Sequence, residues 1–95
     1  MKRTIIPRGE RIPVYLSPRQ RDLLRDHTFC NPEYVALSVV EKKGVRFGWS
    51  LDEIEDIHGH VAAAANHCEN RKLQRELDSL FEKLGTYLIS CEEES

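Results

Sequence analysis

The sequence lacks the features that would place it in a membrane or in a disulfide-rich secreted protein. It has no apolar run approaching the ~20 residues that span a bilayer. The segment before Pro7 offers only the apolar pair Ile5 and Ile6, which is too short for a secretory signal. The three cysteines are odd in number and form no CxxC pair. We therefore expect a cytoplasmic protein with reduced thiols, no disulfide and no membrane partner.

Catalytic and metal-binding signatures are also missing. The chain contains no HExxH and no CxxC, and neither Cys30 nor Cys68 lies in a Gly-flanked turn or at a clear helix start that would activate a thiol. A single domain of 95 residues has little material for a water-excluding cleft. We expect no enzymatic activity and no cofactor, with residues 1–10 as a basic arm and 89–95 as an acidic tail.

Apolar spacing predicts an α+β fold in which a small antiparallel sheet packs on a C-terminal helical hairpin. Alternating apolar and polar residues predict strands at about 11–16, 35–40 and 45–49. Pro13 has no backbone N–H to donate, which favours an edge position for the first strand. Gly44 is expected to supply a positive φ in the turn before the last strand.

A further helix is predicted at 18–27, because Ser17 followed by Pro18 is typical of a helix start. Asn31, Pro32 and Glu33 have the same character and are compatible with another helix. The residues that follow are mostly β-formers, however, so we expect a strand at 35–40 there.

The C-terminal half predicts two helices, at about 51–66 and 70–84. Ser50 and Glu53 have the spacing of a capping box. The apolar period breaks between Cys68 and Leu73, which favours a helical hairpin over one long rod. Gly85 is expected to end the second helix.

The two helices are the predicted interaction surface. Small residues on the first helix let another helix approach closely, and the apolar faces exceed what one small hairpin buries. We therefore predict a homodimer or a protein partner held through the helices. The residues expected on that surface are Gly59, Ala63, Leu77, Leu80, Phe81 and Leu84.

A metal or thiol site is a weaker hypothesis, centred on His67 and Cys68, with His60 as the other candidate ligand. His60 and His67 share a helix face, but two turns separate them by about 10 Å, too far for one ion. Asp56 lies one turn before His60 and has the spacing to pair with it.

Charge is distributed unevenly along the chain. Residues 1–28 hold seven basic side chains against three acidic ones, whereas 50–70 hold five acidic and no basic ones. One interpretation is that the two groups pair within the fold or across a dimer. The alternative is a nucleic-acid-binding regulator whose basic arm contacts phosphates through Lys2, Arg3, Arg8 and Arg11.

The strand 11–16, followed by the helix 18–27 and preceded by a basic arm, resembles the opening of ribbon-helix-helix repressors. In that family a strand pair from a dimer enters the major groove. The resemblance covers about 20 residues. The sequence then departs from the family pattern, because 35–49 predicts strands and Pro13 disturbs the strand pairing. The leading expectation is therefore a non-enzymatic interaction or regulatory module.

Overall fold

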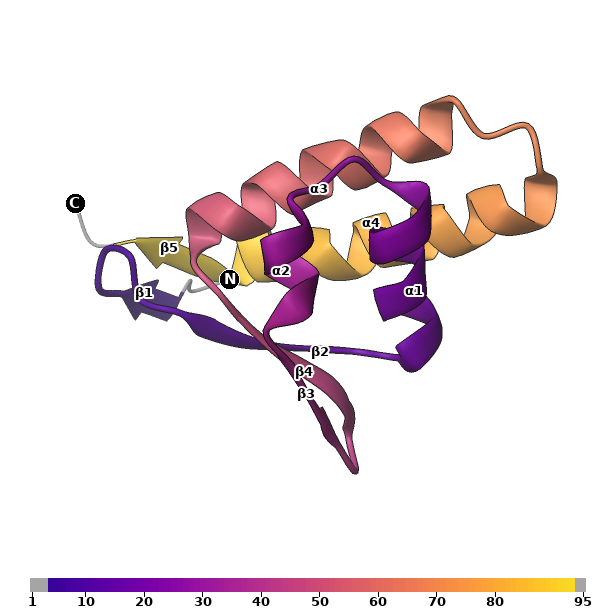
Figure 1. Cartoon of the computed structure of the whole chain (residues 1–95). Helices are drawn as coiled ribbons and strands as arrows, with labels where there is room; N and C mark the ends of the chain where they lie inside the picture. The colour runs from indigo at the N-terminus through magenta and orange to yellow at the C-terminus, as the bar shows by residue number, and fades with distance from the viewer. Residues whose placement is uncertain (1–3, 94–95) are drawn as a thin grey trace.

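A three-stranded antiparallel sheet and a pair of long helices are the main parts of the fold (Figure 1). The computed structural model describes residues 4–93. Along the chain the elements are β1 (Thr4–Ile6), β2 (Ile12–Leu16), α1 (Pro18–His27), α2 (Pro32–Ala36), β3 (Ser38–Glu41), β4 (Gly44–Trp49), α3 (Leu51–Asn66), α4 (Arg71–Ser90) and β5 (Cys91–Glu93). The predicted α+β class with a C-terminal helical hairpin is confirmed.

The sheet has the strand order β2-β4-β3, so β4 is central and β2 and β3 are edges. Pro13 lies opposite Gly48 on the edge strand β2, as its missing N–H predicts. Side chains alternate between the two faces, and one face is buried. The buried positions of β2 and β4 are Val14, Leu16, Val45, Phe47 and Trp49.

One core joins this inner face to all four helices. α3 and α4 run side by side as an antiparallel pair (Figure 1). Because α1 and α2 bury Leu23, Leu24 and Val35 in the same cluster, they lie on the same side of the sheet as the pair. The core residues of the pair itself are Leu51, Ile54, Ile57, Val61, Ala65, Leu77, Leu80 and Leu84.

The predicted helix starts are confirmed by their capping contacts. The Ser17 hydroxyl accepts from the Gln20 amide at 3.1 Å, and the Gln20 side chain accepts from the Ser17 amide. Ser50 and Glu53 form the same reciprocal pair, at 3.2 and 3.0 Å. Asn70 caps α4 by accepting from the Leu73 amide. Each cap satisfies amide donors that the first turn of a helix leaves without an intrahelical partner.

The prediction of a strand at 35–40 is wrong at its start. Residues Pro32–Ala36 form the short helix α2, with Asn31 accepting from the Glu33 amide as its cap. The strand β3 begins only at Ser38. A tertiary contact favours the helix, since the Trp49 indole N–H donates to the Tyr34 carbonyl at 2.9 Å. Intrinsic strand preference is weak enough for such a contact to override it.

The prediction that Gly85 ends the last helix is also wrong, because α4 continues to Ser90. The Gly85 position faces α3, and a Cβ there would lie 3.4 Å from Nε2 of His58. The His58 ring stacks on Phe81 with centroids 3.9 Å apart. Glycine at position 85 therefore leaves room for His58 of α3 and does not end α4.

The predicted arm and tail are not free extensions where the structure describes them. β1 pairs in parallel with β5, with Thr4 opposite Cys91 and Ile6 opposite Glu93. The Gly9 amide also donates to the Glu93 carboxylate at 2.8 Å. This pairing brings the two ends of the described chain together (Figure 1). Within residues 4–93 no helix has the length and apolar character to cross a membrane.

Two glycines should respond oppositely to alanine. Gly44 has φ +132°, and a Cβ there would lie 2.7 Å from the Leu16 carbonyl oxygen. Gly44→Ala should lower the free energy of unfolding by about 1–3 kcal/mol, because backbone cannot yield as a side chain does. Gly59 lies inside α3, and a Cβ built there would have no neighbouring atom within 4 Å. Gly59→Ala should therefore raise the free energy of unfolding by about 1 kcal/mol. Urea unfolding of both variants measures this, and shifts in the same direction would contradict it.

Candidate functional site

The predicted helical interaction surface is divided by the fold. Leu77, Leu80 and Leu84 are buried in the chain's own core, so they are not available to a partner in this structure. Phe81 is half-buried against His58. Gly59 and Ala63 are exposed on α3. Of the residues predicted for this surface, the exposed ones are therefore the small Gly59 and Ala63.

The histidine and cysteine candidates are spread along α3 and the turn after it. Nε2 of His60 lies 3.8 Å from the Asp56 carboxylate on the outer side of the helix. His67 is the exposed C-cap residue, and the Cys68 thiol donates to the Asn70 carbonyl at 3.3 Å. Among residues 4–93 no group of three or more His, Cys, Asp or Glu side chains is placed to hold a metal ion.

The basic candidates are partly engaged by carboxylates. Arg8 is exposed in the turn between β1 and β2. Arg11 donates to the Gly48 carbonyl at 2.8 Å and to Glu53 at 3.1 Å. Lys2 and Arg3 lie outside the described residues. An ion pair between Arg19 and Glu76, at 2.6 Å, joins α1 to α4, and hydrogen bonding to Arg19 lowers the pKa of Glu76. The Arg11–Glu53 pair joins the basic first segment to the acidic segment 50–70, as one interpretation of the charge pattern expects, whereas Glu76 lies on α4, outside that segment.

An exposed apolar strip lies at the free edge of the sheet. Within the described chain β3 pairs with β4 alone, so its other side carries main-chain groups without a strand partner. Leu37, Val39 and Val40 are 82%, 51% and 71% exposed. Leu37 and Val39 also line a shallow groove of about 340 Å³ with Arg11, Pro13, Arg46, Phe47 and Gly48. Adjoining large apolar side chains at a strand edge are typical of a protein contact.

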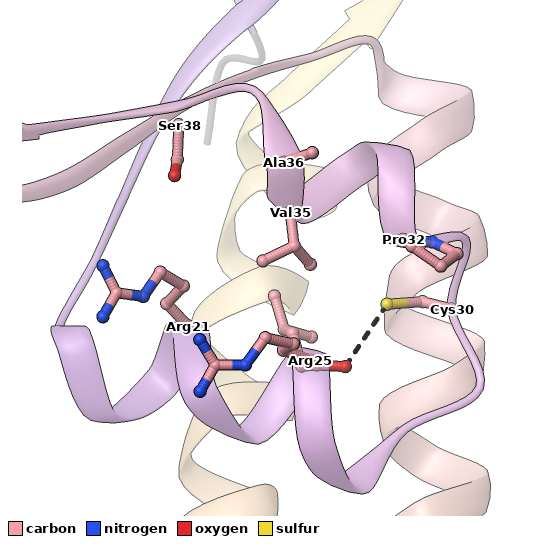
Figure 2. Close-up of a pocket in the computed structure, with 8 residues that line it drawn as sticks. Arg21, Arg25, Cys30, Pro32, Val35, Ala36 and Ser38 are labelled. Carbon is pink, nitrogen blue, oxygen red and sulfur yellow. Dashed lines mark hydrogen bonds between the residues drawn. The ribbon is translucent and has the colours of Figure 1, made fainter.

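A pocket of about 490 Å³ opens between α1 and α2 (Figure 2). Its lining comes from α1, the connection after it, α2 and the first residue of β3. The lining residues are Arg21, Leu24, Arg25, Cys30, Pro32, Val35, Ala36 and Ser38. Arg21 and Arg25 direct their guanidinium groups to one end, and Cys30 and Pro32 lie at the other (Figure 2). The pocket therefore has a cationic end and an apolar end.

The thiol in this pocket has a structural role. Cys30 is buried, and its Sγ lies 3.6 Å from the Leu24 carbonyl near the end of α1 (dashed line in Figure 2). The Thr28 hydroxyl donates to the same carbonyl at 2.6 Å. Together these groups satisfy a carbonyl in the last turn of the helix, where intrahelical donors run out. All three cysteines are free thiols, as the sequence predicts.

Neither the free edge of β3 nor the pocket between α1 and α2 was predicted from the sequence. The two arginines are one helical turn apart, which was a readable signal for a shared face. The opposite wall of the pocket depends on α2, whose last residues, 35 and 36, were predicted to begin a strand. For β3, the adjacent valines were visible, but only the strand order makes their strand an edge.

Comparison of the chain with protein-family models, with curated proteins and with solved structures finds no match.

The half-buried His58 should make stability depend on pH. Burial lowers the pKa of His58. In the unfolded chain His58 therefore gains a proton near the ordinary histidine value of about 6.5, whereas in the folded chain its ring remains neutral at that pH. Stability is full above that value and declines as the pH falls below it, by at most about 1.4 kcal/mol per pH unit for one proton. We expect urea unfolding to show this decline, and His58→Phe, which keeps a ring against Phe81, to reduce it.

The matched control is His67→Gln, because His67 is exposed. That variant should leave the contribution from His58 in place. A decline in His58→Phe equal to that of the unaltered chain would contradict the role assigned to His58.

Proposed function

We propose that this protein is a small, non-enzymatic interaction module that associates with a second copy of itself through the free edge of β3. The observation that carries the proposal is the exposure of Leu37, Val39 and Val40 on and beside a strand with an open side. Natural edge strands are often protected by being very short, by proline, by charged side chains or by a covering element. β3 is short, but it contains no proline and no lysine, and its one charged residue, Glu41, pairs with Arg46 of its own chain.

The charges of β3 are compatible with pairing to its own copy. In a two-fold antiparallel pair centred on Val39, each Val39 faces its symmetry mate and Leu37 faces Glu41. Centring on Val40 instead places Val39 opposite Glu41. Neither register sets like charges opposite each other, an arrangement that destabilises strand pairs. Glu41 is also neutralised within its own chain by Arg46 at 3.4 Å.

Such a contact would extend the three-stranded sheet into a six-stranded one across two copies. β3 has four residues, so the interface is small, and small interfaces give weak or transient complexes. We therefore propose a reversible dimer that forms at high concentration. A regulatory role fits an association of this strength, since modest changes in concentration alter the dimer fraction. Free thiols support a reducing compartment such as the cytoplasm for this module.

Lysine on the strand edge should prevent this association. Val39→Lys and Val40→Lys place a charge where a second strand would lie. Sedimentation velocity from micromolar to millimolar concentration should show a monomer–dimer equilibrium for the unaltered chain. Each variant should weaken it by about tenfold or more. Ile89→Lys is the matched control, because Ile89 is also an exposed apolar residue but lies on α4.

A chain that stays monomeric at the highest concentration would contradict the proposal, and so would an equal loss of association in Ile89→Lys. Salt-sensitive binding of a DNA duplex by a monomeric chain, lost in Arg8→Gln, would favour the nucleic-acid alternative instead.

A further inference from the structure

The pocket between α1 and α2 has the size and shape of a small-molecule site. Its volume of about 490 Å³ lies within the ~300–1,000 Å³ that ligand pockets occupy. Two helices and the first residue of β3 form its walls, so most of its lining belongs to regular elements rather than to loops.

The charge of the pocket is of one sign. Arg21 and Arg25 are its charged lining residues, and no acidic side chain is among those that line it. The two arginines lie one turn apart on α1, so their side chains share a face of the helix. Ser38 directs its hydroxyl toward the same end of the pocket (Figure 2). This end therefore offers guanidinium and hydroxyl donors.

Arg21 is the less engaged of the two arginines. Its side chain is 28% exposed, and its contacts with Asp22 are 3.4 Å from Nε and 3.3 Å from Nη2. Both exceed the usual N–H···O range of about 2.7–3.2 Å. Arg25 also contacts Asp22, at 3.2 Å, so one carboxylate oxygen is shared between two cations. Arg25 has Asp26 as a second partner at 3.0 Å. A half-buried guanidinium with only long contacts favours a further anion.

The other end of the pocket is apolar. Leu24 and Val35 are buried core residues that reach the lining from α1 and α2. Pro32 and Ala36 add further apolar surface. Because the Cys30 thiol donates to the Leu24 carbonyl, its sulfur adds a polarisable apolar contact at this end of the pocket. A compact hydrocarbon body would be removed from water at this end while its charged group stays with the arginines.

From these features we infer that the pocket binds a small organic anion, an oxyanion head group carried on a compact apolar body. The head group accepts hydrogen bonds from Arg21 and Arg25, and the body packs on Leu24 and Val35. The planar fork of arginine matches both carboxylate and phosphate oxygens, so the shared chemistry is the oxyanion. This binding is separate from association through β3 and does not depend on it.

The test uses the whole 95-residue chain, isotope-labelled and titrated with four probes while amide NMR spectra are recorded. Benzoate and phenyl phosphate carry both parts of the proposed ligand. Benzyl alcohol carries the body alone, and inorganic phosphate carries the head group alone. We expect one or both aromatic anions to shift the amides of α1, α2 and Ser38, and to bind about tenfold or more tightly than either partial probe. The tighter of the two anions identifies the head group.

Arginine variants then locate the head group. Arg21→Gln should weaken the tighter anion about tenfold, and Arg21→Lys, which keeps the charge but loses the fork, should weaken it less. Arg71→Gln is the matched control, because Arg71 is an exposed arginine in the first turn of α4. The amide spectrum of each variant without probe reports whether it is folded.

Four results would each overturn the inference. Equal binding of benzyl alcohol and the aromatic anions would leave only an apolar hollow. Equal binding of inorganic phosphate and phenyl phosphate would leave only surface charge. An absence of localised shifts with millimolar probe, or an equal loss of affinity in Arg71→Gln, would remove the pocket as a site.

Discussion

The burial of Trp49 is the interaction on which the rest of the structure depends. Its ring stacks on Phe47 with centroids 4.5 Å apart at the centre of the sheet's inner face. A buried indole N–H needs an acceptor, and it finds the Tyr34 carbonyl of α2. That carbonyl lies in the middle of a five-residue helix, which is so short that its last carbonyls lack intrahelical donors. One hydrogen bond thus satisfies two groups and fixes α2 over the sheet.

Two features of functional interest follow from the position of α2. The helix supplies one wall of the pocket. Because residues up to Ala36 are helical, β3 begins only at Ser38, which lines the pocket at its cationic end. Leu37, between the helix and the strand, is left exposed. The free edge of β3 and the anion pocket are therefore neighbouring surfaces of one segment, 32–41. This short segment therefore contributes residues to both proposed contacts.

The candidate site was less predictable than the elements around it. Leucines of the last helix were predicted to form a partner surface because the apolar faces exceed what one small hairpin buries. Periodicity, however, marks a buried face without saying what buries it. Leu80 and Leu84 are buried in the chain's own core. Arg21 and Arg25 were seen only as charge, because their shared pocket needs a second wall from residues about ten positions further along.

The sequence by itself determined the elements whose signals are local. Ser17, Ser50 and Asn70 fixed where three helices begin, because a cap acts on amides two or three residues away. Pro13 marked β2 as an edge strand, and Gly44 marked the turn between β3 and β4, for equally local reasons. The tertiary structure alone decided that Val35 lies in a helix, that Gly85 faces His58, and that the first and last described residues pair as strands. Those outcomes depend on contacts between residues 15 to 87 positions apart, which no local pattern encodes.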